Sequence, residues 1–175
     1  MNLVLIGYRG TGKSHVGSLL AEKLGMKVVS MDEEIVKQAG MSIPQLVETR
    51  GWSEFRDRET AEARKLAGLD GLVIDCGGGV IERPENIEIL QQNARVFWLK
   101  ASVATIVARI EGGSERPALV AGKTFTEEVA EVLQRRTAKY QGAAHHQIDT
   151  DDATPRQVAE AIVALWEQRR DLSST

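Results

Sequence analysis

The chain has 175 residues, of which 42% are hydrophobic, and this size and composition suit one compact domain spanning residues 1–175. Its 22 basic and 25 acidic residues give a net charge of −3 without a long basic run, which disfavours binding to nucleic acid or to a membrane surface. The single cysteine, Cys76, excludes an internal disulfide, and the sequence has neither a signal-peptide pattern nor an apolar run of ~20 residues. We therefore expect a soluble, cytoplasmic protein. A monomer is a separate expectation, which these observations do not determine.

Short apolar runs with strand character recur along the chain, and a helical pattern follows most of them. The runs are Leu3–Ile6, Val28–Val29, Leu72–Ile74, Val96–Leu99 and a segment near Ile148. This alternation predicts an α/β fold with a parallel sheet and helical crossovers. The first helix is expected to end at Gly25, and the last to begin at Thr154, where Gln157 completes a capping box. The polar, Gly-containing segment Gly112–Lys123 is typical of a functional lid, at about residues 112–124.

The first strand leads into Gly7–Ser14, GYRGTGKS, which matches the phosphate-loop pattern G-x-x-x-x-G-K-[ST] between a strand and a helix. In such a loop, backbone N–H groups and the helix N-terminus attract a polyphosphate. Lys13 reaches its β and γ oxygens, and Ser14 ligates Mg²⁺. An ordinary glycine-rich turn would not need Lys and Ser at that spacing. We expect ATP with Mg²⁺, bound through Gly10, Thr11, Gly12, Lys13, Ser14 and His15.

A phosphate loop also occurs in GTPase switches and motor ATPases, so further features must separate these classes. The N/T-K-x-D motif by which a GTPase reads its base is absent from the sequence. A motor ATPase usually needs a longer chain and oligomeric partners. A kinase for a small acceptor fits this length best.

Acidic residues follow the second strand, and Asp32 stands at its carboxyl edge, where open α/β sheets bind ligands. A preference of acidic side chains for a helix N-terminus explains the same position equally well. Both interpretations stay open at this point.

Two arginines, Arg56 and Arg136, fall on the apolar sides of their predicted helices. An inward cation needs an anion. Glu59, three residues after Arg56, either forms an ordinary helix pair with it or steers it toward a ligand carboxylate. For Arg136 the alternative is that its long side chain reaches solvent.

Three consecutive glycines, Gly77–Gly79, directly follow the third strand. Such a run costs chain entropy unless a positive φ is required or another group must approach the backbone closely. We favour a ligand site here over a plain turn.

Taken together, these features resemble the shikimate kinase family over nearly the whole chain. The family motifs are a phosphate loop, D-x-D, G-E-x-x-F-R with a following Glu, G-G-G, R-P-L-L in a lid, and R-x-x-x-Y. The corresponding segments are, in order, Gly7–Ser14, Ser30–Asp32, Gly51–Arg56 with Glu59, Gly77–Gly79, Arg116–Leu119 and Arg136–Tyr140. Six ordered motifs at suitable spacings are far more specific than any one of them.

The resemblance implies a P-loop fold like that of nucleoside monophosphate kinases, in which a doubly wound sheet of five parallel strands forms three layers with helices on both sides and a mobile lid. It also implies transfer of the ATP γ-phosphate to the 3-hydroxyl of shikimate, with Lys13, Asp32 and Arg116 as the catalytic residues. The residues implied to bind shikimate are Asp32 for the diol, Arg56 and Arg136 for the carboxylate, and Gly78 or Gly79 through a backbone N–H. Arg116 would act from the lid, and Arg109 would lie near the adenine.

Ser30 stands where the family usually has a metal-site Asp, so Mg²⁺ must be held differently here. Asp75 ends the third strand in an apolar-apolar-Asp-x-Gly-Gly pattern like a Walker B motif, and that strand end is expected beside the phosphate loop. Mg²⁺ keeps several waters, so Ser14 directly and Asp75 through water would suffice. The alternative is that Asp75 only caps the glycine turn.

Two other functions compete with shikimate phosphorylation. The first is a related kinase for another small acid, such as gluconate. The second is a weakly active homologue that binds nucleotide to regulate a partner, although the presence of Lys13, Asp32 and Arg116 argues against it.

Overall fold

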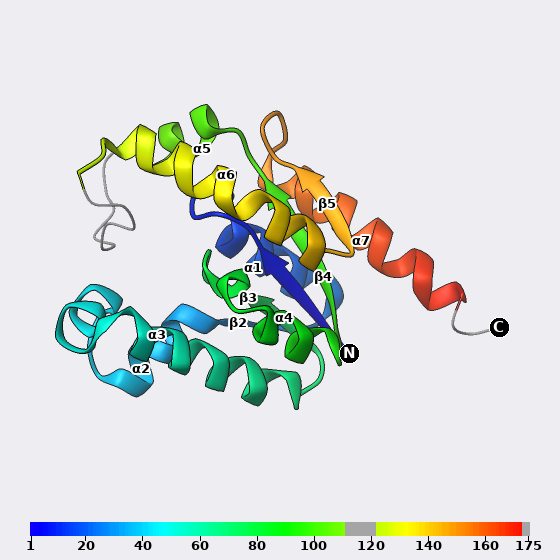
Figure 1. Ribbon diagram of the computed structural model, residues 1–175. Coiled ribbons are helices and arrows are strands. Elements are labelled where there is room, and N and C mark those ends of the chain that lie inside the picture. The colour runs from blue at the N-terminus through cyan, green and yellow to red at the C-terminus, as the bar shows by residue number, and fades with distance from the viewer. Residues whose placement is uncertain (111–121, 173–175) are drawn as a thin grey trace.

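The computed structural model describes residues 1–110 and 122–172, and Figure 1 shows its helices arranged around a central sheet. Five strands form one all-parallel sheet in the order β2-β3-β1-β4-β5. They are β1 (Asn2–Ile6), β2 (Lys27–Ser30), β3 (Leu72–Asp75), β4 (Ala94–Lys100) and β5 (His146–Asp149). The predicted fold of five parallel strands is therefore confirmed.

Seven α-helices and one 3₁₀ helix accompany the strands within the described residues, and the last helix follows the last strand. They are α1 (Lys13–Leu24), α2 (Met31–Ala39), α3 (Ile43–Ala67), the 3₁₀ helix η1 (Val80–Glu82), α4 (Pro84–Gln91), α5 (Val103–Ile110), α6 (Phe125–Ala143) and α7 (Pro155–Leu172). The predicted helix ends are confirmed, because Gly25 adopts the left-handed conformation after α1. Thr154 and Gln157 also exchange the two hydrogen bonds of a capping box before α7.

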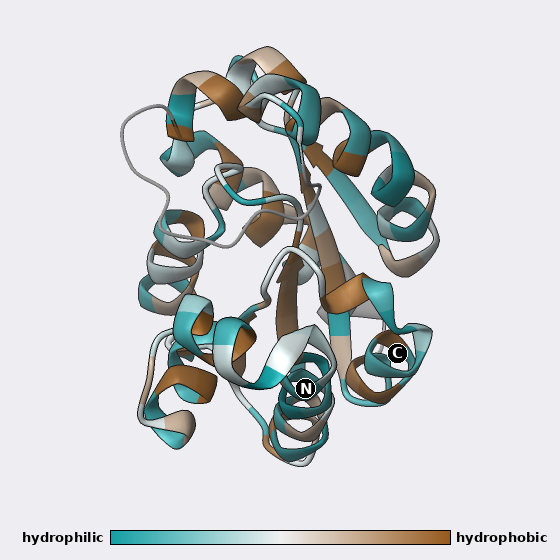
Figure 2. Ribbon diagram, turned by 60° about the vertical axis from the view of Figure 1, so that its left-hand side comes forward, coloured by the Kyte–Doolittle hydropathy of each residue, from teal (hydrophilic) through white to brown (hydrophobic). Residues whose placement is uncertain are grey.

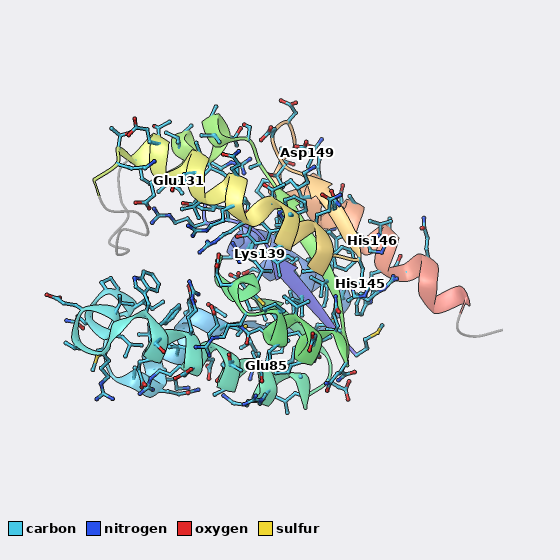
Figure 3. The ribbon with its side chains drawn as sticks, in the orientation of Figure 1. Glu85, Glu131, Lys139, His145, His146 and Asp149 are labelled. Atoms are coloured by element: carbon cyan, nitrogen blue, oxygen red, sulfur yellow. The ribbon has the colours of Figure 1, made fainter. Side chains whose placement is uncertain are left out.

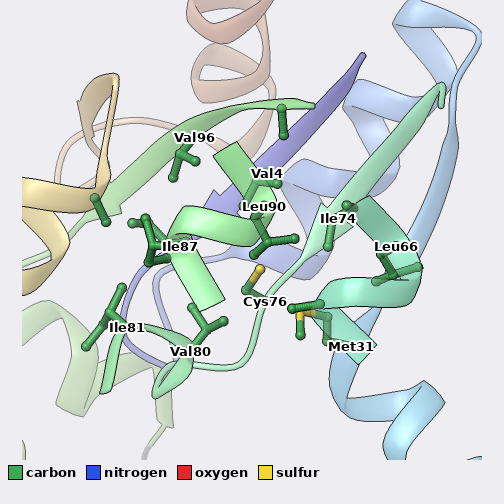
Figure 4. Close-up of a cluster of buried hydrophobic side chains, with 14 of the residues drawn as sticks. Val4, Met31, Leu66, Ile74, Cys76, Val80, Ile81, Ile87, Leu90 and Val96 are labelled. Atoms are coloured by element: carbon green, nitrogen blue, oxygen red, sulfur yellow. The ribbon is translucent and has the colours of Figure 1, made fainter. Parts of the chain in front are cut away.

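Side chains of the central strand point alternately to the two faces of the sheet, and each face has its own helical cover. Leu3 and Leu5 pack in a cluster with residues of α1 and α7. Val4 and Ile6 pack in the opposite cluster, which α3, α4 and α6 complete and which Figure 4 shows in close-up. Figure 2 shows the hydrophobic colour concentrated in the central strands, with mixed colours along the helices. This burial on both faces gives the three layers of a doubly wound fold.

The strand order brings the candidate site residues to one edge of the sheet. β1 pairs with β3 and β3 with β2, all in parallel, so the carboxyl ends of these three strands are neighbours. Asp75 at the end of β3 lies beside Leu5 of β1 on one side and Ser30 of β2 on the other. Segments far apart in the sequence therefore converge where the phosphate loop begins.

Helix α3 is interrupted at Gly51, whose φ of 84° and ψ of 166° are not helical. A left-handed φ of this kind favours glycine, so the residue marks a break between two helical pieces. The second piece carries Phe55 and Arg56, and Phe55 packs with Ile35 and Leu46 in a small apolar cluster between α2 and α3. Across the described ranges, no helix has the length and apolarity that a membrane crossing requires.

Candidate active site

The phosphate loop joins β1 to α1 and holds the lysine that the sequence singles out. Lys13 is only 8% exposed, and its Nζ donates to the carbonyl oxygens of Gly7 at 2.8 Å and Tyr8 at 3.1 Å. The side chain of Thr11 braces the same loop, since its Oγ1 donates to the Tyr8 carbonyl at 2.8 Å. Gly12 precedes α1 without a side-chain cap, so the first N–H groups of the helix face the loop opening. This is the arrangement of an anion-binding loop.

A solvent-facing space opens above this loop at the carboxyl edge of the sheet. Its lining comprises Arg9, Gly10, Gly12, Lys13, Ser14, His15, Ser30, Asp32, Glu33, Asp75, Cys76, Gly77 and Gly78. Five of the six residues predicted to contact ATP through the loop line this space, and the sixth, Thr11, supports the loop from beneath. The space therefore suits the phosphate groups of a nucleotide.

The predicted metal pair is brought together beside the loop. Ser14 at the start of α1 donates from Oγ to Asp75 Oδ2 at 2.7 Å, so the two hard oxygen groups lie in direct contact. Ser30 has another task, because its Oγ accepts a hydrogen bond from the Glu33 N–H and caps α2. The expectation that the end of β3 lies beside the phosphate loop is confirmed.

A second pocket adjoins the first and has an empty volume of about 480 Å³, measured out to its open mouth. Its lining comprises Tyr8, Arg9, Asp32, Ile43, Trp52, Phe55, Arg56, Glu59, Gly77, Gly78, Gly79 and Arg136. All five predicted acceptor residues are among them. Asp32 lines both pockets, so a group bound in the second pocket is placed next to the phosphates in the first. We call this second space the acceptor pocket.

The three glycines Gly77–Gly79 bring functional side chains against the backbone. A Cβ on the first would lie 2.6 Å from Asp32 Oδ1, and one on the second would lie 3.5 Å from Arg136 Nη1. On the third it would lie 2.4 Å from both terminal nitrogens of Arg56. None of the three has a positive φ, so close approach of side chains, and not backbone torsion, explains Gly77 and Gly79, whereas 3.5 Å at Gly78 is an ordinary contact.

Arg56 forms the helix pair with Glu59 and also lines the acceptor pocket, while its contact with a ligand carboxylate stays a prediction. Its Nη1 donates to Glu59 Oε1 at 3.0 Å. Its guanidinium carbon also lies 5.3 Å from the centroid of the Trp52 ring, within the range of a cation–π contact. The glutamate and the aromatic ring together fix the direction of the guanidinium.

Arg136 is 4% exposed, so the alternative in which its side chain reaches solvent is wrong. Its Nε donates to Glu82 Oε1 at 2.7 Å, a contact that the sequence does not predict. Burial opposes the charge of Arg136, but its contacts with Tyr140 and Glu82 outweigh burial and keep the pKa of the guanidinium above its ordinary value. Arg136 therefore stays a cation at the inner end of the acceptor pocket.

Glu59 is the buried acid of the acceptor pocket. It is 1% exposed, and its Oε2 has no hydrogen-bond partner among the residues that the structure describes. Burial raises the pKa of this carboxyl from 4.5 to about 7, although the charge and hydrogen bond of Arg56 act in the opposite direction. The nearby Asp32 carboxylate raises the pKa further, and Arg136 lowers it. The pocket thus contains a carboxyl that titrates near neutral pH.

This shift makes folding stability depend on pH through Glu59. Below the unfolded pKa of 4.5 the carboxyl is neutral in both states. As the pH rises from 4.5 to about 7, the unfolded chain has released the proton that the folded protein still holds, so folding becomes less favourable. Relative to Glu59→Gln, we expect the unfolding free energy of the natural protein to fall by about 3 kcal/mol between pH ~4.5 and ~8.

Urea denaturation of both proteins across this pH range measures the difference directly. Glu48→Gln, at an exposed position on the same helix, is the matched control and should follow the natural protein. Equal pH slopes for the natural protein and Glu59→Gln would contradict the raised pKa.

Arg109 at the end of α5 ties the phosphate loop to the segment after β5. Its Nη2 donates to the Thr150 carbonyl at 2.8 Å, and its Nη1 donates to Thr150 Oγ1 at 3.1 Å and to the Gly10 carbonyl at 3.3 Å. These contacts place Arg109 next to the loop, while its contact with adenine stays a prediction. Arg116 and lid residues 112–121 lie outside the described residues.

Comparisons with known proteins agree with this geometry. The sequence model of the shikimate kinase family matches residues 9–167. A shikimate kinase of Thermodesulfovibrio yellowstonii is 40% identical over 167 residues, which cover 95% of each chain. The structure of Acinetobacter baumannii shikimate kinase in complex with shikimate is similar with a TM-score of 0.90 and 33% identity, covering 96% of this chain and 93% of the other.

A gluconokinase from Sinorhizobium meliloti covers 99% of this chain and 97% of its own, but with 18% identity and a TM-score of 0.59. That likeness shows a shared fold alone. The match of the family model to most of the chain and the near-complete alignment with curated relatives show that the chain belongs to the shikimate kinase family.

Proposed function

We propose that this protein is a shikimate kinase, which transfers the γ-phosphate of ATP to the 3-hydroxyl of shikimate. The observation that carries the proposal is an acceptor pocket with two inward guanidinium groups that opens beside the phosphate loop. Phosphoryl transfer depends mainly on positioning and electrostatic stabilisation, and both pockets contribute to these.

The acceptor carboxylate is recognised by Arg56 and Arg136. These arginines come from different elements, α3 and α6, and both line the acceptor pocket. A planar guanidinium donates two parallel hydrogen bonds to a carboxylate, so the pair discriminates against uncharged sugars. The N–H of Gly78 or Gly79 adds a backbone donor beside them.

Asp32 orients the acceptor hydroxyl and receives its proton. It is the acidic residue that lines both pockets, so it lies where a hydroxyl of the bound acceptor would face the γ-phosphate. Lys13 binds the phosphate oxygens from within the loop. By its place in the family motif, Arg116 from the lid would meet the charge that develops on the transferred group.

The oxygen donors at the phosphate loop fit Mg²⁺, which takes few protein ligands and keeps several waters. Ser14 would hold the ion directly and Asp75 would hold it through water. Ser14 Oγ lies 2.7 Å from Asp75 Oδ2, so the two groups are close enough to share one ion. When bound with ATP, the ion would neutralise phosphate charge. The cytoplasmic location and monomeric state stay predictions from the sequence.

Asp75→Asn is expected to raise the Mg²⁺ concentration needed for half-maximal activity by about tenfold or more, because outer carboxylates tune metal affinity by that amount. The measurement is a Mg²⁺ titration at saturating ATP and shikimate. Asp57→Asn, on the exposed side of α3, is the matched control. A Mg²⁺ dependence equal to that of the natural protein would remove Asp75 from the metal site.

An assay of ADP release with shikimate and gluconate side by side tests the proposed function. Turnover with shikimate and none with gluconate is the expected result. Turnover with gluconate alone would identify a related small-acid kinase. ATP binding without turnover of either acid would favour a regulatory, nucleotide-binding homologue.

A further inference from the structure

Glu82 joins the 3₁₀ helix η1 to helix α6. It ends η1, the short 3₁₀ helix that directly follows the three glycines. Its Oε1 accepts a hydrogen bond from Arg136 Nε at 2.7 Å, and its Oε2 accepts one from Lys139 Nζ at 3.3 Å. Both donors belong to α6, where Figure 3 labels Lys139. One carboxylate thus binds two cations of the same helix.

With its Nε engaged in this contact, Arg136 still lines the acceptor pocket. Nε is engaged by Glu82, whereas Nη1 lies 3.5 Å from the Cβ position of Gly78 at the pocket wall. A guanidinium is planar, so a hydrogen bond at Nε fixes the direction of its two terminal nitrogens. Tyr140 strengthens the arrangement, because its hydroxyl donates to the Gly78 carbonyl and ties α6 to the glycine loop a second time.

We propose that Glu82 is a positioning residue that holds Arg136 with its terminal nitrogens directed at the acceptor carboxylate. The inference rests on the proposed function, in which Arg136 binds that carboxylate. Glu82 itself does not line the acceptor pocket, so it acts through the arginine.

Positioning and simple electrostatics predict opposite results when Glu82 is removed. A carboxylate at this place opposes the binding of an anionic acceptor, so charge alone predicts tighter binding without it. Positioning predicts weaker binding, because a long arginine side chain that has lost its Nε partner must be ordered by the acceptor instead. The direction of the change in shikimate KM therefore separates the two effects.

The first experiment measures kcat and the KM values of shikimate and ATP in Glu82→Ala and Glu82→Gln. We expect Glu82→Ala to raise the shikimate KM about tenfold, with kcat and the ATP KM within about twofold of the natural protein. Glu82→Gln keeps an oxygen that accepts from Nε, so it should restore most of the affinity. Glu85→Ala is the matched control, because Glu85 lies on α4 and pairs with Arg64 outside the pocket (Figure 3).

An unchanged or lower shikimate KM in Glu82→Ala would overturn the proposal. A double-mutant cycle in kcat/KM adds a second criterion, since Glu82→Ala should cause no further loss once Arg136 is Ala. A full additional loss in that background would show that Glu82 acts independently of the arginine, which also contradicts the proposal.

A measurement without acceptor separates this proposal from the proposed function. In ¹⁵N-arginine-labelled protein, the Nε proton of Arg136 should exchange slowly with solvent, and Glu82→Ala should accelerate that exchange while Glu85→Ala leaves it unchanged. Unaltered exchange in Glu82→Ala overturns the positioning contact even if shikimate is turned over. Accelerated exchange supports the contact even if shikimate is not the acceptor. Whether shikimate is the acceptor is decided separately, by the turnover of the natural protein.

Discussion

Asp32→Asn is expected to lower kcat by about 10²- to 10⁴-fold, because the amide cannot accept the proton of the acceptor hydroxyl. Asp32 follows the cap of α2 and lines both the phosphate space and the acceptor pocket. Gly77 leaves its side chain room, since a Cβ there would lie 2.6 Å from Asp32 Oδ1. Asparagine has the same shape and also tolerates the first turn of a helix, so the fold should be preserved.

ADP release at saturating ATP and shikimate measures this effect, and circular dichroism verifies the fold. Asp57→Asn makes the same chemical change on an exposed part of α3, where Asp57 pairs with Arg83, and should leave kcat near that of the natural protein. If Asp32→Asn retained more than about a third of kcat with chemistry rate-limiting, Asp32 would not be the proton acceptor.

Arg136→Ala is expected to weaken shikimate affinity by about 10- to 100-fold while ATP affinity stays nearly unchanged. The variant loses a charge-assisted contact with the carboxylate, and it leaves Glu82 with one cationic partner fewer near the pocket. We propose that ATP binds in the space above the phosphate loop, and the lining of that space does not include Arg136.

Titration calorimetry with shikimate and with ATP checks the two affinities separately. The adjacent Arg135→Ala is a stringent control, because Arg135 has the same charge on the same helix but is exposed. Equal shikimate affinity in Arg136→Ala and the natural protein would require the acceptor site to be placed elsewhere.

Much of the fold and of the acceptor site is predictable from sequence, and the reason lies in the parallel sheet. Once β1, β2 and β3 are recognised as parallel strands, their carboxyl ends must share an edge. The phosphate loop, Asp32 and Asp75 are therefore predicted to converge, and the space that all three line, together with the contact between Ser14 and Asp75, confirms this. The inward direction of Arg56 and Arg136 can be predicted from helical periodicity. Each arginine falls on the apolar side of its helix, and a cation that points into the protein needs an anion beside it.

The partner of Arg136 is not predictable in this way. Glu82 lies 54 residues away in the sequence, and no periodicity connects a 3₁₀ turn to a face of α6. The close contacts at Gly77–Gly79 are likewise not predictable from local sequence. They involve Asp32, Arg56 and Arg136, which come from three different helices. Such contacts depend on how helices pack across the layers, which the local pattern of one segment does not specify.

Trp52 is an intrinsic fluorescence probe of the acceptor pocket. Of its three tryptophans, Trp98 and Trp166 are 4% and 7% exposed within the two clusters that cover the sheet. Trp52 instead lines the acceptor pocket against the guanidinium of Arg56. Indole emission responds to nearby charge and water, so occupancy of the pocket is expected to alter the fluorescence of Trp52. Acceptor binding can thus be followed by light in the unlabelled protein, in the absence of any turnover.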